Sequence, residues 1–526
     1  MEEEYSVTDP TQLLEAASDF AHHPGFLSDA STQEFLNRFP LPVIINALQT
    51  KGDVPGLENA LVASLEKIFA TKYGASLIPQ YMPFVVVGLG ADSQKVRCIA
   101  CKTVSSLLEY SDETNVSATR LLVEYDVYPL LLKCLIDGDE QVATASMDAI
   151  RKLAGSPERL GIVFPANANE TTHLRNVAAG CSSLGRVRVL ALVVKLFSIS
   201  SSVASAVYNS NLLSLLEAEL SNENDTLVTL NVLELFYELA ENQHSTEFLS
   251  RTTLLQILTS VISNMSIGSI LRARAMTIIG RLLSKEDFFM FTDESSVKTV
   301  ISAVDGRLGL LECQDADEFE CTVEALGQIG TTIRGATLLL TSSPPTARHV
   351  VDAAFDQHGR GKQLAALHAL ANVTGETRSE SDRMLNIDAE ERLRLLIHEA
   401  ASKSSKLTPS GLLLSVLQQE SEIRLAGYRL ITGLVARPWC LMEIFSRQEI
   451  INIVTDPYAE TTKIGMEARH NCCQAISKAL LSSPKLTSDP ALAGIAAKLD
   501  EAIRRGPYLA RKNSEAQPAV MTADRF

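Results

Sequence analysis

Two groups of cysteines come closest to a metal-binding or redox spacing in this sequence. Cys98 and Cys101 form a CxxC motif, which holds zinc when a second such pair supplies the remaining thiolates, but the sequence has no second pair. A redox CxxC is expected beside a βαβ unit, whereas this one lies within a predicted helix. Cys472 and Cys473 follow His470, yet Cys472 falls on an apolar helix face, where a thiol acts as a small hydrophobic group. We therefore expect no metal ion and no cofactor.

Glycine-rich motifs for nucleotide phosphates are also incomplete. The segment 358–362, His-Gly-Arg-Gly-Lys, would match GxxxxGK only with glycine in place of Asp356, and Gln363 stands where serine or threonine would bind magnesium. Gly88 and Gly90 follow three valines but lack the third glycine of a dinucleotide-binding turn. No GxSxG motif for a nucleophilic serine occurs. We therefore predict that the protein is not an enzyme.

The composition favours helices and a protein partner. The chain is 46% hydrophobic and 6% aromatic, and it holds only 27 glycines and 19 prolines in 526 residues. This share of glycine and proline is below the average of about 12%. The formal net charge of −16 argues against nucleic acid or an anionic membrane surface as the main partner.

Three features indicate an intracellular protein. The first ten residues, MEEEYSVTDP, are acidic and unlike a signal or transit peptide. No run of about 18 apolar residues is present to span a membrane. Nine cysteines, an odd number in a long chain, are typical of free thiols in a reducing compartment. We expect the protein in the cytoplasm, with the nucleus as a second compartment.

The stretch 420–457 contains the clearest structural unit. Four residues at helical spacing form one face of its first helix: Ile423, Gly427, Ile431 and Leu434. Pro438 ends this helix, because proline has no N–H and disfavours helical geometry in the preceding residue. A short amphipathic segment, Leu441–Phe445, and a second apolar run, Ile450–Val454, follow. Such a unit buries its apolar faces only by stacking on copies of itself.

Nine further rows of this kind occur along the chain. They are Leu57, Leu61, Leu65 and Ile68; Val96, Ala100, Val104 and Leu107; Val142, Ser146, Ile150 and Leu153; Arg186, Leu190, Val194 and Phe197; Val228, Val232, Phe236 and Leu239; Leu271, Ala275, Ile279 and Leu282; Phe319, Val323, Gly327 and Gly330; Lys362, Ala366, Leu370 and Val373; and Ile464, Ala468, Cys472 and Ala475. Successive rows start 39 to 48 residues apart, with one interval of 61. Armadillo and HEAT repeats have a period of roughly 40–47 residues.

The rows predict an all-α fold, a right-handed superhelical α-solenoid of about ten armadillo/HEAT-like repeats over residues 51–505. Second helices are expected between the rows, at Val127–Leu135, Leu212–Leu220, Leu254–Ile262, Val297–Val304 and Ile450–Val454. The short lead-in segments before several of them are more typical of armadillo than of HEAT repeats. Residues 1–50 are predicted to form a helical cap, and 506–526 a disordered tail without periodicity.

The long interval contains a predicted insertion at 374–410, rich in charges of both signs. One interpretation is a solvated loop leading into a short helix around Ala389–Ala400. The other is a loop that contacts a partner or carries a modification, which only its length favours. Both interpretations remain open at this point.

Several motifs of the last repeats resemble those of a known family. They are Arg437-Pro438-Trp439, Met442 to Phe445, Ile450–Val454, and Gly506-Pro507-Tyr508. In these motifs and in repeat number and length, the chain resembles the 26S proteasome non-ATPase regulatory subunit 5 family, armadillo/HEAT-type chaperones for assembly of the regulatory particle base. The resemblance implies a chaperone that binds the C-terminal domain of a base AAA ATPase subunit and leaves before the proteasome matures. The motifs are structural, so no contact residue is carried over.

Other interaction proteins with this architecture were weighed against that family. An importin-α-like cargo adaptor needs an asparagine four residues after tryptophan in many repeats, but this chain has only Trp439, followed by Glu443. A generic armadillo-type scaffold or adaptor in signalling or cytoskeletal complexes remains the alternative. We expect a monomer when no partner is bound.

The second helices are expected to line the concave side and to bind the partner there. Their apolar stripes face neighbouring helices, which leaves these residues pointing outward: Lys133, Gln256, Ser260, Lys298 and Ser302. We predict that this inner face holds the ATPase domain. A partner bound elsewhere, with this face merely solvated, is the competing interpretation.

Overall fold

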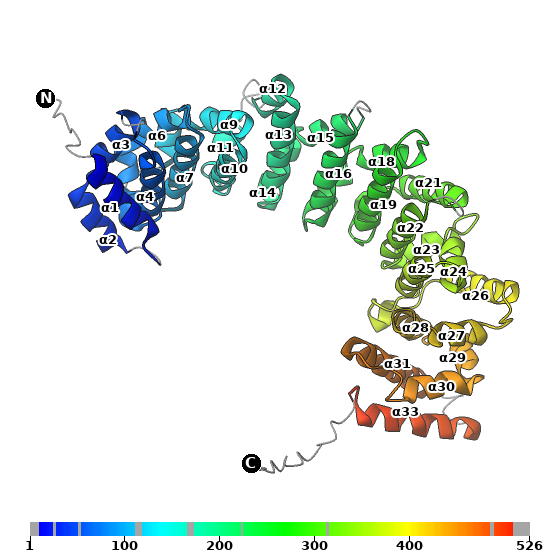
Figure 1. Ribbon diagram of the computed structural model, residues 1–526. Coiled ribbons are helices and arrows are strands. Elements are labelled where there is room, and N and C mark those ends of the chain that lie inside the picture. Colours follow the sequence, from blue (N-terminus) through cyan, green and yellow to red (C-terminus); the bar gives the residue numbers. More distant parts are fainter. Residues whose placement is uncertain are drawn as a thin grey trace, which may run out of the picture. The chain divides into compact units, whose positions relative to one another are not determined.

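Helices form the regular structure of this chain. The computed structural model describes residues 10–24, 28–50, 54–110, 118–165, 173–221, 225–311, 315–483 and 489–508, and no strand occurs among them. The predicted rows lie on helices, apart from Gly330, which directly follows the helix of its row, and this confirms the all-α solenoid (Figure 1). In the same part of the chain, no helix has both the length and the apolar character needed to cross a bilayer. The handedness of the superhelix stays a prediction.

The chain divides into two compact units, Met1–Thr252 (unit 1) and Thr253–Phe526 (unit 2). We call the helices that carry the predicted rows the row helices. In unit 1 they are α4 (Leu57–Phe69), α7 (Gln94–Tyr110), α10 (Glu140–Ala154), α13 (Ser183–Phe197) and α16 (Thr226–Glu241). In unit 2 they are α19 (Ser269–Leu283), α22 (Ala316–Ile329), α25 (Arg360–Val373), α28 (Ser421–Leu434) and α31 (Lys463–Leu481).

A connecting helix and then a second helix follow most row helices, which gives the three-helix repeat typical of armadillo proteins. The connecting helices are α5 (Lys72–Leu77), α8 (Ala118–Glu124), α11 (Leu160–Val163), α14 (Ser201–Asn209), α17 (Ser245–Leu249), α20 (Phe288–Phe291), α23 (Ile333–Thr341), α26 (Ile387–Lys403) and α29 (Pro438–Phe445). The second helices are α6 (Met82–Leu89), α9 (Val127–Asp137), α12 (His173–Gly180), α15 (Leu213–Leu220), α18 (Leu254–Ser263), α21 (Glu294–Leu311), α24 (Ala347–Phe355), α27 (Pro409–Leu417), α30 (Gln448–Thr455) and α33 (Ala493–Arg505). All five predicted second helices are among them.

Three helices precede the first row helix: α1 (Pro10–His22), α2 (Asp29–Arg38) and α3 (Leu41–Thr50). Helix α1 packs on α4, so this segment covers the first row helix. Short 3-10 helices occur at Ile78–Tyr81, Glu380–Asp382 and Pro490–Leu492. Most of the predicted tail, residues 509–526, lies outside the described residues.

Glycines let the row helices of unit 2 approach closely. A Cβ atom on Gly280 of α19 would lie 2.8 Å from the Cα atom of Ala325 in α22. A Cβ atom on Gly327 of α22 would lie 2.6 Å from the Cα atom of Ala369 in α25. In Figure 1 these row helices lie on the inner side of the bend of unit 2, and α21, α24, α27 and α30 lie on its outer side. The close spacing explains this arrangement, because the layer with the shorter helix-to-helix distance must lie inside a bend.

Two arginines, the partly buried Arg188 and the buried Arg469, join second helices to row helices. Nη1 of Arg188 in α13 donates to the carbonyl oxygens of Leu135 (3.1 Å) and Gly138 (2.7 Å) at the end of α9. Nη1 of Arg469 in α31 donates to the carbonyl oxygen of Val454 at the end of α30 (2.8 Å). The last carbonyl groups of a helix have no donor within the helix and carry partial negative charge. A guanidinium group supplies both the missing donor and a compensating positive charge.

The last predicted row is wrong at its first residue. Ile464 is 67% exposed, and the buried face of α31 starts instead at Gly465 and continues through Arg469 and Cys472. A Cβ atom on Gly465 would lie 2.7 Å from Oε2 of Glu460, so the Glu460 side chain lies directly against this glycine. Gly465 thus lies on the buried face of α31, and the preceding Ile464 lies on the exposed face.

The segment 374–410 is a structural part of its repeat. Its helix, expected around Ala389–Ala400, is α26, which buries Leu393 and Ile397. Glu390 of α26 accepts hydrogen bonds from Nε (2.7 Å) and Nη2 (2.9 Å) of the buried Arg437 at the start of α29. The interpretation as a merely solvated loop is therefore incomplete, since this segment supplies the partner of a buried charge.

Candidate interaction surfaces

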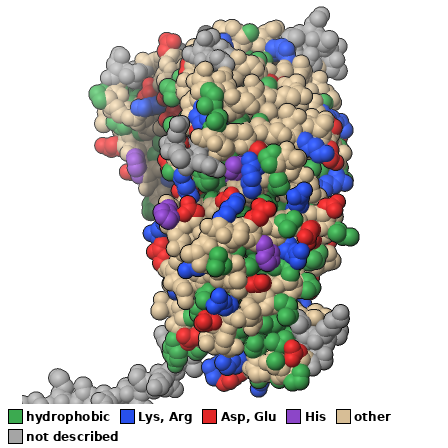
Figure 2. Space-filling view, turned by 90° about the vertical axis from the view of Figure 1, so that its right-hand side faces the viewer, with side chains coloured by type: hydrophobic (Ala, Val, Ile, Leu, Met, Phe, Trp, Pro, Cys, Tyr) green, Lys and Arg blue, Asp and Glu red, His purple; other side chains and the backbone are tan. Residues whose placement is uncertain are grey.

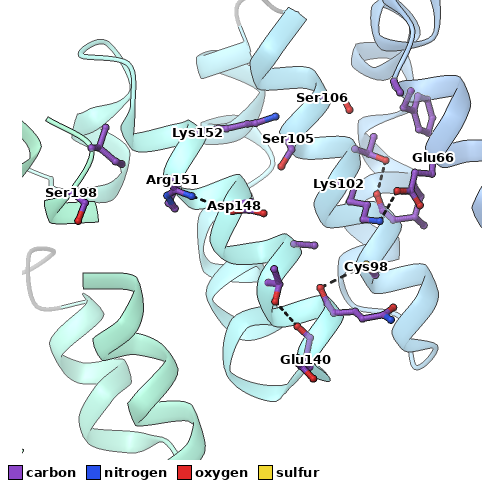
Figure 3. A pocket seen from close by; sticks show the side chains of 18 residues that line it. Glu66, Cys98, Lys102, Ser105, Ser106, Glu140, Asp148, Arg151, Lys152 and Ser198 are labelled. Atoms are coloured by element: carbon purple, nitrogen blue, oxygen red, sulfur yellow. Dashed lines mark hydrogen bonds and ion pairs between the residues drawn. The ribbon is translucent and has the colours of Figure 1, made fainter. Parts of the chain in front are cut away.

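A groove crosses the row-helix layer of unit 1. It runs over α4, α7 and α10 to the end of α13 and has a volume of about 1200 Å³. Its lining includes Glu66, Lys102, Ser105, Asp148, Arg151 and Ser198 (Figure 3). We call it the row groove.

Ion pairs connect neighbouring row helices along this layer. They join Lys102 to Glu66 (α7 to α4, 2.6 Å), Lys152 to Glu109 (α10 to α7, 2.6 Å) and Lys195 to Glu238 (α13 to α16, 2.5 Å). All six side chains are between one third and three fifths exposed, so each pair adds little to stability. The pairs instead fix where positive and negative charges lie on the surface.

The step from α10 to α13 differs from its neighbours. No ion pair between described residues joins these two helices, and Arg151 pairs only with Asp148 on its own helix (3.5 Å). Helix α13 packs on α9, where a Cβ atom on Gly185 would lie 2.8 Å from Cγ2 of Ile136. The predicted row is also less regular here, because its first residue is the polar Arg186. The wall of the row groove between α10 and α13 is therefore open, and Arg151 lies at this opening with Ser198 opposite (Figure 3).

The chemistry of the row groove suits a protein surface. Acidic and basic side chains alternate in it with serines and with the apolar Phe69 and Ile199. Such a mixture matches the polar rim and partly apolar centre of protein interfaces.

The residues predicted to bind the partner all lie on second helices and are exposed: Lys133 on α9, Gln256 and Ser260 on α18, and Lys298 and Ser302 on α21. Lys133 belongs to unit 1 and the other four to unit 2. The Lys298 ammonium pairs with Glu294 one turn earlier (2.6 Å). Lys298 and Ser302 also line a groove of about 900 Å³ between α21 and α23. Whether any of the five binds a partner stays a prediction.

In unit 2 the predicted side is not the inner one. The row helices occupy the inner side of the bend, so Gln256, Ser260, Lys298 and Ser302 lie on the opposite layer from the one expected (Figure 1). Figure 2 looks toward the outer side, where acidic and basic side chains are interspersed with hydrophobic ones. The small residues on the rows were the signal that could have placed the row helices inside, because they shorten the spacing of that layer.

The cysteine motifs lie inside the helix stack. Burial raises the pKa of the Cys98 thiol, and a hydrogen bond with Cys134, together with burial, raises that of Cys101. Burial also raises the pKa of Cys472. These shifts keep the thiols protonated, whereas metals bind the thiolate. No group of three or more metal-ligating side chains occurs in the part of the chain that the structure describes.

The helix stack and its grooves define a helical-repeat solenoid with surfaces suited to binding proteins. Residues 60–280 match the model of a protein family described as "Proteasome non-ATPase 26S subunit". This part of the chain, which contains the row groove, is therefore similar to a proteasome-related family.

Two further comparisons complete this result. None of the curated protein sequences matches the chain. Among solved structures, the crystal structure of an engineered protein is similar, with 14% sequence identity, a TM-score of 0.42, and coverage of 88% of this chain and 98% of the engineered one.

Proposed function

We propose that this chain is a non-catalytic chaperone that assists assembly of the base of the 26S proteasome regulatory particle. It binds the C-terminal domain of one base ATPase subunit, is a monomer without it, and acts in the cytoplasm and nucleus. The observation that carries this proposal is the match of residues 60–280 to a family of proteasome non-ATPase subunits. The motifs around Trp439 and Tyr508, which resemble those of base assembly chaperones, support the finer assignment.

The row groove is the proposed binding surface. It lies within the residues that match the proteasome family, and its wall is open between α10 and α13. Arg151 is the cation at this opening, and its only ion-pair partner among described residues is Asp148 on the same helix. An acidic group of the ATPase domain is expected to pair with Arg151 there.

The second-helix surface predicted from the sequence is proposed as the competing site. Lys133 and Lys298 are its two cations, and both are exposed. Charge reversal at both positions distinguishes this surface from the row groove.

Affinity purification of the tagged chain at low salt tests the function. We expect base ATPase subunits to be recovered without subunits of the 20S core particle. Recovery of assembled 26S proteasomes would contradict an assembly role, and recovery of signalling or cytoskeletal complexes alone would favour the generic scaffold.

A further inference from the structure

Unit 2 contains a second groove, at the ends of α28 and α31. Its volume is about 1130 Å³. The floor is formed by α31, and Ile503 of α33 closes one end. The opposite wall comes from the loop before α26, through Glu380, Arg383 and Met384. This loop belongs to the segment for which a contact role was considered from its length.

The loop wall is held in place by its arginines. Nη2 of Arg378 donates to the carbonyl oxygens of Asn372 (3.3 Å) and Gly330 (3.4 Å), at the ends of α25 and α22. Nε of Arg383 donates to the carbonyl oxygen of Gly375 (3.3 Å). An ion pair between Glu380 and Lys478 then ties the loop to α31. The loop and α31 therefore form two walls of the groove.

The groove exposes apolar side chains to solvent. Met384 on the loop is 43% exposed and Leu481 on α31 is 64% exposed. Val435 and Leu441 line the groove between them. Covering such side chains is favourable, at roughly 25 cal/mol per Å² of apolar surface removed from water. A short apolar segment would fit.

The described chain ends on the helix that forms the groove floor. Gly506 adopts a positive φ of 76° after α33, and the Tyr508 hydroxyl donates to the Glu467 carboxylate on α31. Glu467, Lys478 and Leu481 are spaced by 11 and 3 residues, which places them on one face of α31. Fourteen residues of helix separate Glu467 from Leu481, about 21 Å.

Residues 509–526 have the length and the composition to reach and fill the groove. The ten residues from Tyr508 to Pro518 span up to about 35 Å when extended, which exceeds the roughly 21 Å between Glu467 and Leu481. The segment contains one uncharged apolar run, Pro518-Ala-Val-Met521, between more polar residues. We propose that residues 518–521 dock in this groove of the same chain, between Met384 and Leu481.

Photo-crosslinking in the full chain tests this docking. p-Benzoylphenylalanine is placed at position 481, with the same residue at Leu310 of α21, which is 57% exposed, as the matched control. We expect crosslinks from position 481 to residues 518–521 and none of these from position 310. Mixing isotopically light and heavy chains distinguishes crosslinks within one chain from those between copies.

A second pair of variants makes the result decisive. The double substitution Val520→Asp and Met521→Asp should reduce the crosslinks at least tenfold, whereas Thr522→Asp and Asp524→Ala should leave them nearly unchanged. A far-ultraviolet circular dichroism spectrum identical to that of the unsubstituted chain checks folding. Crosslinks only between copies, crosslinks to other segments, or no crosslinks would each overturn the proposal.

Discussion

At the scale of single residues, buried ion pairs hold the repeats of unit 2 together. The Arg437 side chain is 1% exposed, and that of its partner Glu390 is 15% exposed. Nη1 of Arg437 also donates to the carbonyl oxygens of Thr374 (3.0 Å) and Gly433 (2.9 Å). One guanidinium thus connects α26, α28 and the end of α25.

Removing the carboxylate should destabilise unit 2 strongly. Glu390→Ala leaves Arg437 buried without a counter-charge, which typically costs about 3–5 kcal/mol. The adjacent Glu391→Ala is the matched control, because Glu391 pairs with Arg394 on the surface and such pairs contribute about 0–1 kcal/mol. Urea unfolding followed by circular dichroism measures both. Equal losses in the two variants would contradict the structural role of Glu390.

Glu318 predicts an acid-sensitive step in unit 2. Burial alone would raise its pKa, but hydrogen bonds from Arg272 and Arg307 outweigh burial and lower the pKa from 4.5 to about 2. A carboxylate whose pKa is lower in the folded than in the unfolded state stabilises the fold at pH values above the unfolded pKa. The contribution of Glu318 is therefore lost as the pH falls from 4.5 towards 2.

We therefore expect the unfolding free energy of the unsubstituted chain to fall more steeply over this pH range than that of Glu318→Gln. Urea unfolding at a series of pH values gives both slopes. Parallel slopes would show that Glu318 does not carry the acid sensitivity.

At the scale of helices, glycine on a row marks a close contact. Gly427 of α28 faces α27, where its Cβ atom would lie 2.7 Å from Cγ1 of Val416. Gly427→Leu should overpack this contact and cost about 1–3 kcal/mol. Gly306→Ala is the control, since nothing lies within 4 Å of its Cβ position in the middle of α21. The control should stabilise the helix by about 0.5–1 kcal/mol, and a loss equal to that of Gly427→Leu would refute the contact.

Leu434→Ala probes the same helix from its buried end. Leu434 is fully buried, so the truncation should leave a cavity and cost about 2–5 kcal/mol. The unfolding midpoint in urea measures the loss. A cost below 1 kcal/mol would mean that the end of α28 relaxes to fill the space.

The helices were predictable because their apolar spacing is local. The row from Leu57 to Ile68, for example, is buried as predicted, because its apolar residues recur on one face of the helix. The orientation of the layers was not predictable in this way, because it depends on helix-to-helix distances set by pairs such as Gly327 and Ala369. For this reason Lys298 and Ser302 were predicted on the inner side of unit 2, whereas they lie on its outer layer.

At the scale of the molecule, the fold was evident from the sequence, but the groove that we propose as the binding surface was not. The ten rows share nearly one period, which can be read from the sequence. The opening of the row groove between α10 and α13 instead brings together residues far apart in the chain, Arg151 and Ser198. The less regular row around Gly185 was the one local sign of this opening. Its meaning becomes clear only when α13 is seen to pack on α9.

The affinity of the purified chain for the C-terminal domains of the base ATPase subunits, measured by titration calorimetry, tests the central claim most directly. Arg120→Glu on α8 serves as an exposed control, and all variants should keep their unfolding free energy within about 0.5 kcal/mol. The account predicts tight binding to one domain, weakened at least tenfold by Arg151→Glu and unchanged by Lys133→Glu with Lys298→Glu. Binding that Arg151→Glu leaves intact and the double reversal abolishes would contradict the row groove, and binding to none of the domains would contradict the proposed function itself.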